Sequence, residues 1–69
     1  MNLVGPRVRR LREAQKMTQE ELTARCNVVG LNISRGTLAK IESRVRRVTD
    51  EEAALLAKAL KVPVEALYK

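Results

Sequence analysis

The sequence lacks most of the residue types on which catalytic and RNA-binding sites depend. It contains no histidine, and Tyr68 is its single aromatic residue. The scarcity of aromatic side chains leaves no platform on which unpaired bases could stack, which argues against RNA binding. The chain has no phosphate-binding loop, metal-binding cluster or paired acids in an apolar setting, so it predicts neither an enzyme nor a cofactor.

Cysteine and long apolar runs are equally scarce. Cys26 is the single cysteine, which excludes an intramolecular disulfide and favours a small core residue over a redox or metal site. No apolar stretch is long enough to span a membrane, and no signal-peptide pattern opens the chain. These features predict a cytoplasmic protein with no membrane partner.

The length of 69 residues fits a single domain over residues 1–69. A domain this small buries only about 60% of the surface of its unfolded chain, so helix caps should matter for its stability. Hydrophobic residues make up 45% of the chain, which is enough to build an aliphatic core.

Positive charge is concentrated in the first two thirds of the chain. Residues 1–48 contain eleven Lys and Arg against four Glu, a net charge of +7. Residues 49–69 contain three Lys against four acids, a net charge of −1. Such a distribution predicts a basic face that binds a polyanion, although a merely solvated surface could carry the same charge.

Three start signals divide the chain into helices. Thr18 with Glu21 and Thr49 with Glu52 have the spacing of capping boxes, and Ser34 is the expected cap of a helix between them. We expect helices over roughly 5–16, 19–27, 35–43 and 50–61, then a short fifth helix within 62–69. The positions expected to face the core are Val4, Val8, Leu11, Leu22, Cys26, Leu38, Ile41, Ala53, Leu56, Ala57, Leu60 and Leu67. No alternation of period two is present, so the sequence predicts an all-α, compact five-helix bundle.

Two short helices joined by a turn, the second of them basic, are typical of a helix-turn-helix. Read in order, "LREAQKMTQEEL" (11–22), "ISRGTLAKIES" (33–43) and "LLAKALKVPVEAL" (55–67) resemble the phage-repressor and Cro-type helix-turn-helix family. The resemblance implies a lambda-repressor-like domain and a sequence-specific, double-stranded DNA-binding transcriptional regulator, such as a repressor or a small prophage or mobile-element regulator. It also implies a homodimer on a two-fold symmetric site, formed through the last helix and the loop before the fourth.

The resemblance further implies roles for individual residues. The recognition helix would span about 34–43 and enter the major groove, where an arginine can donate two hydrogen bonds to guanine. Arg12 and Glu42 match a buried ion pair between the first and third helices. Ser34 and Thr37 could alternatively serve only as caps. The residues expected on DNA are Gln19, Ser34, Arg35, Gly36, Thr37, Lys40, Arg44 and Arg46.

One departure from the family pattern is the length of the turn between the second and third helices. The stretch between Leu22 and Ser34 is several residues longer than the family's tight turn, and we assign the excess to "VVGLN" (28–32). These residues are too apolar for a solvated loop, so we expect some of them to fold back onto the core. A longer second helix would also absorb them.

A second hypothesis is a protein-interaction module, such as an antitoxin or a coactivator, whose DNA binding is secondary. In that case a protein partner would bind an exposed apolar patch around Val62, Val64 and Tyr68.

Overall fold

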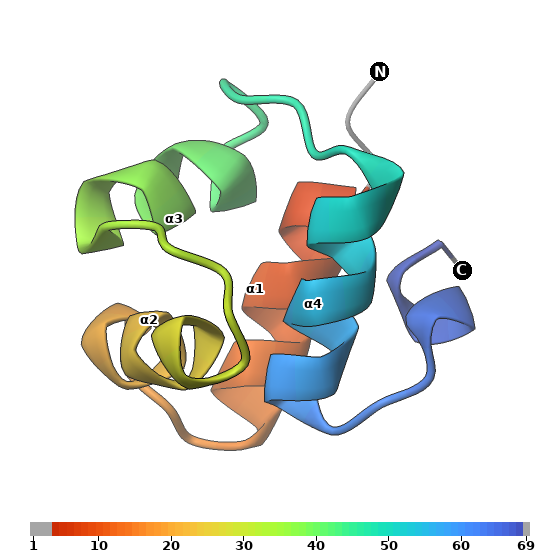
Figure 1. The fold of residues 1–69 in the computed structure, drawn as a ribbon, viewed down its shortest axis with the longest axis horizontal. Coiled ribbons are helices and arrows are strands. Elements are labelled where there is room, and N and C mark those ends of the chain that lie inside the picture. The colour runs from red at the N-terminus through yellow and green to blue at the C-terminus, as the bar shows by residue number, and fades with distance from the viewer. Residues whose placement is uncertain (1–3, 69) are drawn as a thin grey trace.

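The computed structural model describes residues 4–68 and, within them, consists of helices joined by short turns, with no strand (Figure 1). The elements are α1 (Val4–Ala14), α2 (Gln19–Val28), α3 (Arg35–Glu42), α4 (Asp50–Leu60) and the 3-10 helix η1 (Val64–Leu67). Figure 1 shows α1 and α4 next to each other at the centre, with α2 and α3 on one side and η1 on the other. The all-α prediction is confirmed for the described residues.

The fifth element differs from the prediction, because η1 is a four-residue 3-10 helix and not a further α-helix. Pro63 precedes it in an extended conformation and supplies no side-chain cap. The segment instead closes i to i+3 hydrogen bonds, from the Ala66 N–H to the Pro63 carbonyl and from the Tyr68 N–H to the Glu65 carbonyl, both at 3.0 Å. Leu67 is nevertheless buried, as predicted.

Both predicted capping boxes are present. The Glu21 N–H donates to the Thr18 hydroxyl at 3.1 Å, and the Thr18 N–H donates to a Glu21 carboxylate oxygen at 2.9 Å. Thr49 and Glu52 repeat this arrangement at 3.1 and 3.0 Å. These reciprocal bonds satisfy N–H groups that the first turn of a helix would otherwise leave without partners.

The four α-helices share one type of C-terminal cap. One or two residues after each helix ends, a residue has a positive φ, and the N–H of the next residue donates to the carbonyl five residues before it, which is the Schellman motif. In α4, for example, the Val62 N–H donates to the Ala57 carbonyl at 3.0 Å. The four positive-φ residues are Lys16, Gly30, Arg44 and Lys61. Three of the four are therefore long cationic side chains at a position where glycine is usual.

The core is aliphatic, as predicted. Every residue expected to face it is buried, except that Leu11 is only partly buried. Met17, Leu31 and Ala59 are buried as well. Near the ends of α1 and α4, the Gln15 side-chain amide donates to the Leu60 carbonyl at 2.7 Å, which ties the two central helices together.

Residues 29–34 join α2 to α3 and are anchored at two points. Leu31 is buried, and the Asn27 side-chain amide donates to the carbonyls of Thr23 and Ile33 at 2.8 and 3.2 Å. Val29 and Ile33 also pack partly buried against the core, so the expectation that some of the apolar residues here fold back is confirmed, while Val28 is 86% exposed at the end of α2. That this connection exceeds the family's usual length stays a prediction.

Candidate nucleic-acid interface

The first turn of α3 carries the residues expected to face base edges. Ser34 is the N-cap, and its hydroxyl accepts a hydrogen bond from the Thr37 N–H at 3.1 Å. The two hydroxyls of Ser34 and Thr37 also lie 3.1 Å apart. Capping therefore engages both hydroxyls in this structure, while Ser34, Arg35 and Gly36 remain exposed at the helix end.

Arg35 extends from this turn toward solvent. Its side chain is 64% exposed, and its nearest acid is Glu20, with Arg35 Nε 4.0 Å from Glu20 Oε1. An exposed pair at this distance contributes little, so Arg35 can exchange Glu20 for another acceptor at small cost. The contact between Arg35 and Glu20 could not be predicted from their spacing in the sequence.

Gly36 is not required by the fold. A methyl group built on it would meet only the Ser34 hydroxyl oxygen, at an ordinary contact distance of 3.8 Å. A glycine here therefore leaves the outer surface of the first turn without a side chain, which permits a close approach by a ligand.

The three basic residues further along differ in how their side chains are held. Lys40 is exposed on α3, and Arg44 is exposed just after it, with a φ of 71°. Arg46 instead forms a two-pronged ion pair with Glu52 at 2.7 and 3.3 Å. This pair, followed by the Thr49 N–H, holds the pKa of Glu52 below its ordinary value. Arg46 therefore stabilises the start of α4, a role that the sequence spacing did not indicate.

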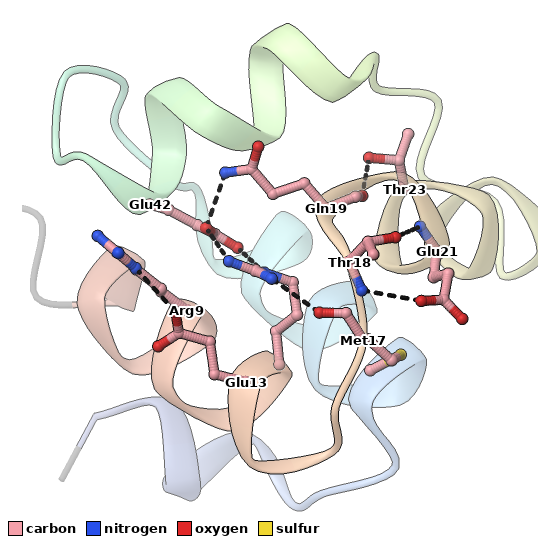
Figure 2. Close-up of polar contacts among 9 residues, drawn as sticks. Arg9, Glu13, Met17, Thr18, Gln19, Glu21, Thr23 and Glu42 are labelled. Atoms are coloured by element: carbon pink, nitrogen blue, oxygen red, sulfur yellow. Dashed lines mark hydrogen bonds and ion pairs between the residues drawn. The ribbon is translucent and has the colours of Figure 1, made fainter.

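A buried polar network fixes α3 relative to α1 and α2 (Figure 2). Arg12 Nε donates to Glu42 Oε2 at 2.8 Å, and a terminal nitrogen of Arg12 donates to Glu42 Oε1 at 3.1 Å. The other terminal nitrogen donates to the Met17 carbonyl at 2.8 Å. The hydrogen bond to Glu42 raises the pKa of Arg12, so the guanidinium stays charged.

Gln19 joins this network from the first turn of α2. Its side-chain amide donates to Glu42 Oε1 at 3.1 Å (Figure 2). Glu42 thus receives hydrogen bonds from α1 and from α2 at the last residue of α3. The Glu42 carboxylate therefore ties α3 to both α1 and α2, and the side-chain amide nitrogen of Gln19 is occupied by this hydrogen bond.

Two other features bear on alternative functions. Burial raises the pKa of the Cys26 thiol to about 11, which keeps it neutral and unreactive near neutral pH. Val62 and Val64 pack partly buried against the core, so the apolar patch expected around them is reduced to Tyr68, which is 51% exposed.

The model of a family described as helix-turn-helix matches residues 8–67. The chain belongs to this family, the Cro- and repressor-type helix-turn-helix proteins. Neither the curated proteins nor the solved structures contain a match.

The match begins within α1 and ends at the last residue of η1, so it includes α2, α3 and α4. Residues 4–68 hold no group of three or more histidine, cysteine or acidic side chains able to bind a metal ion. Nor does any helix of that part reach the length and apolar character needed to cross a bilayer.

Proposed function

We propose that this helix-turn-helix protein is a sequence-specific transcription regulator that inserts the first turn of α3 into the major groove of double-stranded DNA. The observation that supports this most is that α3 begins with an exposed, basic turn while its other end is held firmly in the protein. Ser34, Arg35 and Gly36 face solvent, while the Arg12–Glu42 pair fixes the opposite end of the helix. A side chain can select one base only if its helix is held at a defined angle.

Within this proposal, base reading and backbone contact belong to different residues. Arg35 reads a guanine through two hydrogen bonds, and Thr37 or Lys40 contacts a neighbouring base or phosphate. The first turn of α2 offers backbone N–H groups to a phosphate, beside the amide of Gln19. Arg44 contacts the DNA backbone beyond the other end of α3, where it adds affinity without sequence preference.

The same proposal includes a two-fold dimer that binds half-sites about one helical turn apart. Two exposed apolar residues support a dimer contact through the last helix and the loop before α4, where the sequence predicts it. Val45, in the loop before α4, is 74% exposed, and Tyr68 follows η1. A dimer bound across a promoter in the cytoplasm would exclude polymerase, so we assign the protein to repressors.

In-vitro selection of bound duplexes tests this function directly. The chain is mixed with a library of random duplexes, and the bound fraction is amplified and sequenced over several rounds. We expect one enriched motif with a guanine at a fixed position and with two-fold symmetry. Recovery of unrelated sequences, bound equally well, would show that the chain does not read DNA sequence.

A further inference from the structure

A groove of about 340 Å³ lies between the C-terminal ends of α2 and α4. Figure 1 shows these two helix ends next to each other, below α3 in that view. No residue of α3 lines the groove. It is therefore a surface distinct from the proposed DNA-reading turn.

The floor of the groove is apolar and open. Ala24 and Val28 lie one turn apart on α2, Val29 follows them, and Ala59 contributes from α4. The small alanine side chains leave room between the helices. Ala24 is exposed and Val28 is 86% exposed, so apolar side chains of α2 are in contact with water here. Concave, mostly apolar sites of about this volume with a few polar groups around them are typical of binding sites.

The rim of the groove is positively charged. Arg25, Lys58 and Lys61 line it, and no acidic residue does. Within residues 4–68 their side chains form no hydrogen bond or ion pair, and Glu21 interacts with Arg25 only through its charge. Cations near helix C-termini also complement the helix dipoles. That effect accounts for their position but not for the uncovered apolar floor between them.

We propose that this groove binds an acidic amphipathic helix of a partner protein. Apolar side chains at positions i and i+4 of that helix would contact the exposed Ala24 and Val28, as in other helix-in-groove complexes. Carboxylates on either side of this apolar stripe would pair with Arg25, Lys58 and Lys61. Because α3 takes no part, the protein can hold DNA and the partner together, and the inference does not depend on the proposed DNA function.

Peptide display tests the proposal with two matched variants. The groove variant combines Val28→Asn with Lys58→Gln, and the control variant combines Val45→Asn with Arg10→Gln. Each pair removes one exposed valine and one exposed cation, so both variants lose one apolar side chain and one positive charge. Random 16-residue peptides displayed on phage are selected on the full chain and counter-selected on the groove variant. Circular dichroism verifies that both variants fold.

We expect the enriched peptides to be rich in Asp and Glu and to carry apolar residues at i, i+4 spacing. Their affinity, measured by fluorescence anisotropy, should fall about tenfold on the groove variant and remain unchanged on the control, as for loss of an interface hot spot. Enrichment of peptides without acidic bias, no enrichment, or equal affinity for both variants would overturn the proposal. Self-association of the chain that only the groove variant abolishes would assign the groove to a second copy instead.

Discussion

At the scale of single residues, the sharpest expectation concerns Glu42, which accepts hydrogen bonds from Arg12 and Gln19. Glu42→Ala leaves the buried Arg12 charge without its partner, which should lower the free energy of unfolding by about 3–5 kcal/mol. Urea denaturation measures this directly. The control is Glu13→Ala, which removes an exposed ion pair to Arg9 and should cost at most about 1 kcal/mol. Equal losses in the two variants would show that the buried network does not stabilise the fold.

Two arginines should differ in how they affect DNA binding. Arg35→Ala should cost about 1–3 kcal/mol on the selected site and relax specificity at one base pair, because Arg35 lies in the first turn of α3. Arg44→Ala should weaken binding to all sequences and lower the salt slope by about one unit. Titrations on selected and scrambled duplexes across a salt series separate the two effects. If Arg35→Ala weakens both duplexes equally, Arg35 is a phosphate contact and another residue reads the base.

At the scale of elements, helix starts could be predicted from sequence more readily than helix ends. Thr18 and Thr49 mark the starts of α2 and α4 in the sequence, because a capping box is a local pattern of four residues. Lys16 and Lys61 occupy the positive-φ positions after α1 and α4 in place of the usual glycine, so the ends of these helices lack their commonest sequence mark. The sequence predicts a short helix after Pro63, and its 3-10 form is visible only in the structure.

The cationic helix ends provide a stability test. Lys16 has a φ of 58°, a conformation that costs a residue with a side chain about 1–2 kcal/mol relative to glycine. Glycine also gains entropy in the unfolded chain, so Lys16→Gly should stabilise the protein by a smaller amount, up to about 1 kcal/mol. Lys58→Gly, within α4, should instead destabilise it by about 1 kcal/mol. Thermal melting of both variants decides, and a lower Tm for Lys16→Gly would contradict the prediction.

The start of α4 should make stability depend on pH. The hydrogen bonds from Arg46 and from the Thr49 N–H hold the pKa of Glu52 below its ordinary value of 4.5. A depressed pKa in the folded state adds stability above pH 4.5, and this stability is lost as the pH falls through the folded value. Glu52→Gln should therefore flatten the decline in Tm between about pH 5 and pH 3. Arg46→Gln should flatten it similarly, and a wild-type decline in both variants would exclude this contribution.

At the scale of the whole molecule, the order of helices and the core positions followed from local patterns, whereas contacts between distant segments did not. The α2–α4 groove depends on how two helices pack, and no spacing in the sequence encodes it. The Arg12–Glu42 pair, 30 residues apart, could be expected only from the family resemblance. Local capping and periodicity thus predict elements, and a buried charge pair across elements needs knowledge of the fold.

The last expectation concerns assembly. We expect weak self-association through the loop before α4 and the segment around η1, because Val45 and Tyr68 expose apolar surface there. Binding to adjacent half-sites should strengthen this contact, since DNA holds two copies about 34 Å apart along one face. Sedimentation velocity should show mostly monomer in the free protein and two copies on a palindromic duplex. Val45→Asn should reduce this cooperativity, whereas Val28→Asn, which changes an exposed valine on the α2–α4 groove, should not. A strict monomer both free and on the palindrome would show that the protein acts as a single copy.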